Sequence, residues 1–174
     1  MKIQNLFVFC AVSAAFGSAS LLAQTKQVTV NATVAEMMNL TVDVTAVSFA
    51  FAAADYDVTT GLATKTAAKA TTFSINANRT WKLTAQAGNA TFTFVPTGTA
   101  TDPLKPSNAL SIRTGIVAYA PFSGVVALSV ATGGRGGYST TGNVVPVDYQ
   151  MTSDLAKDMP GSYALTLTYT LAAQ

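Results

Sequence analysis

The chain contains no histidine and a single cysteine, and only 10% of its 174 residues are charged. Without histidine the chain cannot build Ser-His or Cys-His nucleophilic pairs or a His-ligated zinc site. Its one cysteine, Cys10, lies in an apolar leader, so the rest of the chain has no thiol. A glycosidase needs two carboxylates at a set separation in a cleft. Two aspartate pairs could meet that need only by coincidence of folding: Asp55 with Asp57, and Asp154 with Asp158. The sequence therefore predicts a protein that is not an enzyme.

Two polar segments resemble ligand sites only in part. Residues 133–137 read Gly-Gly-Arg-Gly-Gly, but they lack the Gly-Lys-Ser/Thr ending of a phosphate loop and precede no predicted helix. Asp55 and Asp57 flank Tyr56 and could donate oxygens to calcium, although a solvated turn is the favoured interpretation. We therefore expect no cofactor, and a metal only if these two aspartates hold calcium.

Charge is scarce and balanced. The formal net charge is +2, and removing Lys2 with the leader leaves nine basic against eight acidic side chains, or +1. A nucleic-acid surface would need clustered Lys and Arg. A net charge near zero instead leaves self-association unopposed by repulsion.

The first residues have the pattern of an export signal, with Lys2 followed by an apolar stretch and then small residues. We expect a signal peptide at residues 1–23, cleaved after Ser20 or Ala23. The apolar stretch is too short for a membrane span, which needs about 20 residues. The mature protein, residues 24–174, is then expected outside the cell or on the envelope surface of a bacterium.

Strict apolar and polar alternation marks strands along the chain. It is clearest in residues 163–171, where one predicted strand turns five apolar side chains to one face and four small or hydroxyl-bearing ones to the other: Tyr163, Leu165, Leu167, Tyr169 and Leu171 against Ala164, Thr166, Thr168 and Thr170. Shorter alternating runs, separated by turn residues, indicate further strands in residues 28–34, 38–44, 47–51, 73–77, 81–85, 92–94, 110–112 and 145–151.

Where the alternation fails, the pattern predicts bends and loops. The phase slips by one residue at Thr45-Ala46, which predicts a bulge or corner. Residues 64–72 are rich in Ala and Lys and are expected to form an edge strand or a loop. Many short strands in about 150 residues predict one all-β domain, an antiparallel β-sandwich of Ig-like or jelly-roll-like type. Its expected core includes Trp81, Phe92, Tyr163, Leu165, Leu167 and Leu171.

Two short motifs resemble the WxL family of bacterial surface domains. Trp81 and Leu83 flank Lys82 in the first, and the second falls on Tyr163, Leu167, Thr168, Tyr169 and Leu171, with Tyr169 where the family has Trp. The resemblance implies an exported β-rich protein held non-covalently at the envelope, where the domain is implicated in binding peptidoglycan. Trp81 is expected to be a core aromatic first and a glycan contact second.

The segment after the signal gives a second resemblance, to fimbrial or pilin-type subunits. In such assemblies an N-terminal strand of one subunit completes the sheet of the next. The donor candidates here are Val28, Val30, Ala32 and Val34, within residues 27–34. The alternative is that this strand pairs inside its own domain. We expect a structural or adhesive protein whose partners are other copies of itself or related subunits, or alternatively a cell-wall glycan.

Overall fold

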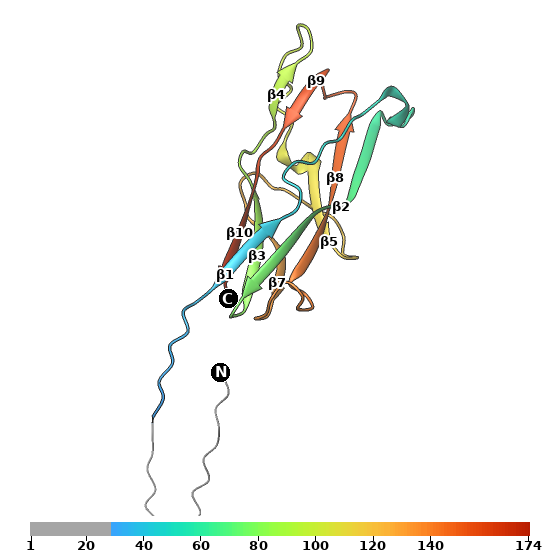
Figure 1. The fold of residues 1–174 in the computed structure, drawn as a ribbon. Helices are drawn as coiled ribbons and strands as arrows, with labels where there is room; N and C mark the ends of the chain where they lie inside the picture. Colours follow the sequence, from blue (N-terminus) through green and yellow to red (C-terminus); the bar gives the residue numbers. More distant parts are fainter. Residues whose placement is uncertain (1–28) are drawn as a thin grey trace, which may run out of the picture. The chain divides into compact units, whose positions relative to one another are not determined.

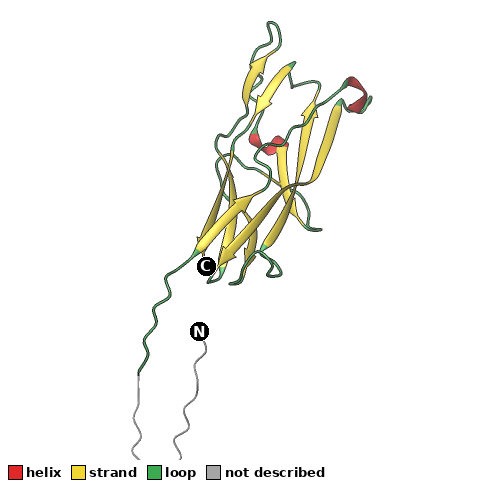
Figure 2. Ribbon diagram, viewed as in Figure 1, coloured by secondary structure: helices red, strands yellow, loops and turns green. Residues whose placement is uncertain are grey.

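The computed structural model describes residues 29–174 and contains two units, Met1–Val34 and Ala35–Gln174. Ala35–Gln174 is built of antiparallel strands (Figures 1 and 2). Its only helical pieces in the described chain are two 3-10 turns, η1 (Ala53–Asp55) and η2 (Ser107–Ala109). The prediction of an all-β antiparallel sandwich is confirmed. The predicted signal peptide lies outside the described residues.

The larger layer is a five-stranded sheet. Its strands lie in the spatial order β1 (Met38–Val42), β2 (Leu62–Ala77), β8 (Val144–Asp154), β5 (Leu110–Thr114) and β6 (Ala120–Pro121). Residues 64–72, predicted as an edge strand or a loop, belong to β2, whose register against β8 shifts between Ala67 and Thr71. β1 pairs only with the second half of β2, from Phe73 to Ala77.

The second layer consists of two smaller antiparallel sheets. One has the order β10 (Leu167–Ala173), β3 (Trp81–Ala87) and β7 (Leu128–Gly133), and the other pairs β4 (Thr93–Pro96) with β9 (Gly161–Ala164). The prediction of one unbroken strand over residues 163–171 is wrong. The connection from β3 to β4 has five residues, whereas the connection from β9 to β10 has only two. Because these lengths differ, the pairing of β3 with β10 cannot continue in register into the pairing of β4 with β9, and the strand is interrupted at Leu165 and Thr166.

Inward-facing side chains of the two layers form the core. Every second residue is buried along β3 and along β2 from Thr71 to Ala77, as the period of two requires, and β8 follows the same pattern except that Asp148 is buried as well. Fully enclosed members include Ile75, Trp81, Leu83, Phe122 and Val147. At about 1.5–3 kcal/mol for each large apolar side chain removed from water, this burial is the main force that holds the layers together.

Two predicted strands are not strands in the structure. Residues 29–34 form neither strand nor helix. Residues 47–51 are also outside any strand, although Val47, Phe49 and Phe51 pack against the core and the residues between them are exposed. The predicted corner is present, because β1 ends at Val42 and the chain bends at Asp43 and Thr45. In residues 47–51 the alternation thus marks the side chains that face the core although the backbone has no partner, whereas in residues 29–34 the alternating apolar side chains are exposed.

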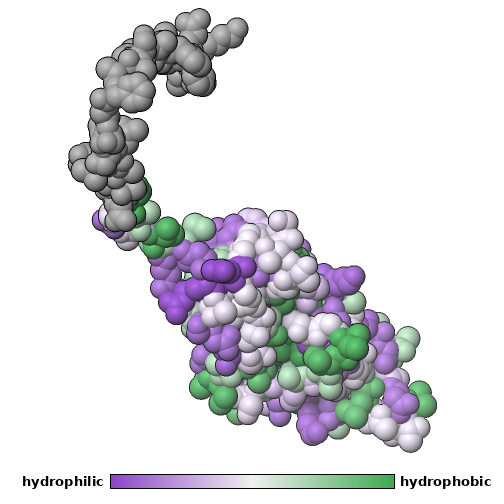
Figure 3. All heavy atoms as spheres, turned by 90° about the horizontal axis from the view of Figure 1, so that it is seen from below, coloured by the Kyte–Doolittle hydropathy of each residue, from purple (hydrophilic) through white to green (hydrophobic). Residues whose placement is uncertain are grey.

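Apolar side chains also remain on the outside. On the face seen in Figure 3, hydrophobic residues are interspersed with hydrophilic ones. Several fully or largely exposed apolar residues lie at loops and strand ends, among them Val58, Val95, Leu104 and Ile116. Scattered exposed apolar residues are ordinary for a soluble domain and do not by themselves mark a binding site.

Candidate binding seam

The predicted donor residues lie at the start of the described chain. Val28 falls outside it. Val30 and Val34 are 85% and 83% exposed, and Ala32 is exposed as well. An alternating apolar segment in this state has buried neither its side chains nor its backbone groups in a sheet, which leaves it available for pairing.

The Trp81 motif has a structural task. Trp81 is fully buried, and its indole N–H donates to the Gly134 carbonyl at 3.0 Å and to Asn143 Oδ1 at 3.2 Å. The Asn143 amide in turn donates to the carbonyls of Gly136 and Gly137 at 3.0 and 3.3 Å. Together these bonds fix the glycine-rich loop over the ring.

The glycine next to this ring is required by space. A Cβ atom on Gly133 would come within 2.2 Å of the Trp81 ring, so no other residue fits there without moving the ring. Trp81 is enclosed on all sides and offers no face to a ligand in this conformation. Leu83, the other apolar residue of the motif, is also fully buried and pairs in register with Leu171 of β10.

The C-terminal motif lies at the margin of the core. Tyr163, Leu167, Tyr169 and Leu171 are half-buried and pack against it. The Tyr169 ring lies 4.3 Å from that of Phe73, and its hydroxyl is 2.5 Å from that of Tyr149. Burial raises the pKa of Tyr169 above its usual range, and the neighbouring Tyr149 adds to the shift. Tyr169 therefore stays uncharged and acts in packing.

An apolar groove of about 1150 Å³ opens beside these residues. We call it the seam. One lip is formed by residues 44–51 and the other by residues 161–167, and core side chains such as Phe73 and Met151 line it between them. The seam is larger than the roughly 300–1,000 Å³ that holds a typical small molecule.

Both lips of the seam leave backbone groups without partners. No backbone hydrogen bond joins residues 44–51 to another part of the described chain, and the last such bond before them runs from Asp43 N–H to the Thr72 carbonyl at 3.2 Å. On the opposite lip, β9 pairs only with β4, and β10 only with β3, within residues 29–174. Unpaired strand edges beside an apolar groove are the usual template for an added strand.

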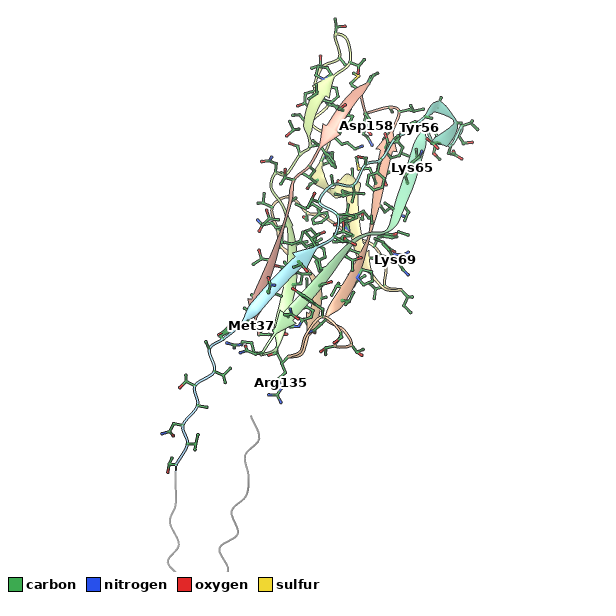
Figure 4. All side chains as sticks on the ribbon, in the orientation of Figure 1. Met37, Tyr56, Lys65, Lys69, Arg135 and Asp158 are labelled. Atoms are coloured by element: carbon green, nitrogen blue, oxygen red, sulfur yellow. The ribbon has the colours of Figure 1, made fainter. Side chains whose placement is uncertain are left out.

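A buried ion pair closes one end of the seam, and no sequence pattern pointed to it. The side chains of Lys105 and Asp158 are only 4% and 10% exposed, and they form a salt bridge. The Asp158 carboxylate also accepts bonds from the Ser153 hydroxyl at 2.8 Å and the Asp154 N–H at 3.0 Å. Tyr56 reaches the same place with its hydroxyl 2.9 Å from that of Ser153 (Figure 4).

This polar cluster is satisfied by its own members. The Lys105 ammonium lies 5.6 Å from the centroid of the Tyr163 ring, a cation–π arrangement that adds to the salt bridge. Lys105 comes from a proline-bounded loop, 53 residues before Asp158. Such a long-range pair has no local sequence signal that could have found it.

Asp55 and Asp57 are used within their own loop. The Asp55 carboxylate accepts the Ala52 N–H at 2.6 Å and pairs with Lys65 at 2.8 Å, and both contacts lower its pKa. Asp57 accepts from the N–H groups of Thr59 and Thr60 at 3.0 and 2.7 Å. In residues 29–174 no three potential ligands among His, Cys, Asp and Glu gather as a metal site would require.

No family model matches the chain, and a search of curated proteins finds no match either. The described residues contain no helix long and apolar enough to cross a membrane.

Proposed function

We propose that this is a non-catalytic bacterial surface protein that assembles with copies of itself by β-strand addition, with residues 28–34 as the donor strand. One observation carries the proposal. The segment has the alternation of a half-buried strand, yet Val30 and Val34 are exposed and residues 29–34 form no strand in the structure.

Strand addition would bury the apolar side chains of this segment and pair its backbone groups. Burying a valine side chain contributes about 1.5–3 kcal/mol relative to leaving it in water. Pairing the backbone with a sheet edge satisfies the N–H and C=O groups of the added strand. The near-neutral charge of the chain places little repulsion between copies. Export, which the proposal needs, rests on the signal pattern of residues 1–23.

The alternative function is non-covalent binding of peptidoglycan or another envelope glycan, as the WxL resemblance implies. Its support is weaker because Trp81, the aromatic residue of the motif, is enclosed and already bonded to Gly134 and Asn143. A glycan would therefore have to use residues outside that motif.

Electron microscopy and size-exclusion chromatography of the chain beginning at Gln24 test the proposal. We expect filaments or a ladder of oligomers. The double variant Val30→Thr/Val34→Thr keeps the side-chain shape but adds hydroxyls to the face to be buried, and it should remain monomeric. Its matched control, Thr29→Ser/Thr33→Ser, changes the other face and should assemble. A monodisperse chain that pellets with purified cell wall would contradict the proposal and favour the alternative.

A further inference from the structure

We infer that the seam is the acceptor site and that its occupant is the segment 28–34 of a second copy of this chain. The inference rests on the proposed function and adds where the strand binds. The three sheets of the described chain have six edge strands that could in principle accept it: β1, β6, β7, β10, β4 and β9. The seam differs from a bare edge because its two lips face a shared apolar groove.

The unpaired backbone groups along the seam favour a strand over a small molecule as its occupant. An extended segment in the groove can pair its backbone with the unpaired groups of residues 44–51 or with the free edges of β9 and β10, whereas a small molecule would leave these groups unpaired. Val47, Phe49 and Phe51 pack against the core while the residues between them are exposed, and residues 44–51 make no backbone hydrogen bond within the described chain. An added strand would supply the backbone partner that residues 47–51 lack.

The chemistry of the donor fits the groove. Residues 28–34 carry no charge; one face is purely apolar and the other consists of Thr29, Asn31 and Thr33. The nearest charged residues, Lys26 and Glu36, lie outside the segment on either side. Apart from the satisfied cluster around Lys105 and Asp158, the groove is lined mainly by apolar side chains, including Phe49, Phe51 and Leu165. An uncharged, alternating strand is the occupant that leaves no charge unpaired in it.

The way the chain enters β1 points to a second copy as the source of the strand. The Asn78 amide donates to the Ala35 carbonyl at 2.7 Å, and the Met37 N–H donates to Asn78 Oδ1 at 2.9 Å. These bonds hold residues 35–37 at the start of β1, whereas residues 44–51 begin beyond its far end, about 17 Å away at 3.4 Å per residue. A strand that directly precedes Ala35 is therefore better placed to enter the seam of another molecule.

Cysteine cross-linking locates the docked strand, since the chain from Gln24 has no cysteine of its own. The variant Thr33→Cys/Thr166→Cys places one thiol on the donor and one on an exposed position of the seam. The matched control Thr33→Cys/Thr132→Cys places the second thiol on another exposed threonine, in β7, at the edge of the three-stranded sheet opposite β10. A short bismaleimide joins thiols without requiring disulfide geometry, and products are read on a denaturing gel.

We expect a covalent ladder from the Thr166 variant and only a trace from the Thr132 variant. If both variants assemble on a sizing column but cross-link equally, or only through position 132, the seam is not the acceptor and the inference is wrong, while strand addition itself stands. If neither variant assembles although the unsubstituted chain does, the pair Thr33→Ser/Thr166→Ser is used to show that the positions tolerate change. If the unsubstituted chain is monomeric, the proposed function fails together with the inference.

Discussion

The surroundings of Trp81 and the seam differ in how completely their side chains are buried and their backbone groups are paired. Around Trp81, side chains are fully buried, β3 has a strand on each side, and the indole N–H is bonded twice. Along the seam, Val47, Phe49 and Phe51 are only half-buried and the backbone of residues 44–51 is unpaired. One region is closed by its own chain, and the other is left open beside it.

The difference divides the domain into a part that holds the fold and a part that is left open, and the open part is where we propose that a partner strand binds. A closed region contributes most of the free energy of unfolding, since fully enclosed side chains and paired backbone groups contribute most per residue. An open region opens locally at little cost and can change its partner without unfolding the rest. The following changes test whether the two regions differ as this account requires.

The largest effect is expected at Trp81. Trp81→Ala should lower the free energy of unfolding by about 3–5 kcal/mol, because it leaves a cavity and strands the Gly134 and Asn143 acceptors. Urea denaturation followed by circular dichroism measures the loss. Trp81→Phe keeps an aromatic ring without the N–H and should lose less. A loss for Trp81→Ala below that of a substitution in the seam would reverse the comparison.

The buried ion pair should be nearly as sensitive. Lys105→Met leaves the Asp158 charge buried without its partner, and we expect a loss of about 3–5 kcal/mol in urea denaturation. Lys157→Met is the matched control, because the Lys157 side chain is 81% exposed in its pair with Asp154 and should contribute little to the free energy of unfolding. Equal losses for the two lysines would mean that the Lys105 site is open to water.

A matched pair of phenylalanines compares the two regions directly. Phe122 is fully buried in the core and does not line the seam, whereas Phe49 is half-buried on a lip of it. Phe122→Ala should cost about 3–5 kcal/mol, and Phe49→Ala about half as much in the unassembled chain. Equal costs, measured by urea denaturation under monomeric conditions, would show that the seam is as tightly packed as the core.

The smallest effect concerns Asp43, the last anchor before residues 44–51. Its carboxylate accepts the Thr72 N–H at 2.6 Å, and this bond lowers the pKa of Asp43. A lowered pKa in the folded state stabilises the fold above the unfolded value of about 3.9, and this stabilisation is lost as the pH falls through the folded value. Asp43→Asn should therefore be slightly less stable than the unsubstituted chain at pH 7, and the gap should narrow as the pH falls below about 3.9. A gap that widens on acidification would refute this role.

The fold could largely be predicted from the sequence, because it depends on a local signal. Alternation of side chains marks which face of a strand is buried, and it located the core strands around Phe73, Trp81 and Val145. The same signal failed at Leu165, where the strand changes sheets, and along residues 47–51, where side chains are inside but the backbone has no partner.

The site was less accessible to such reasoning. The four donor candidates could be named from their alternation alone, but the seam is formed by segments more than 100 residues apart, residues 44–51 and 161–167. The Lys105 and Asp158 pair and the bonds from Trp81 to Asn143 likewise join distant positions. Contacts of this kind depend on how the layers are stacked, and no local pattern encodes them.

Hydrogen exchange of the chain beginning at Gln24, compared before and after assembly, tests most directly whether the seam accepts a strand from another copy. In the dilute monomer the amides of residues 44–51 should exchange rapidly because they have no backbone partner, while amides of β8 are protected. In the assembled protein the amides of residues 44–51 should become protected, and those at the outer edge of β7 should be unchanged. Protection of residues 44–51 already in the monomer, or new protection confined to β7, would contradict the account.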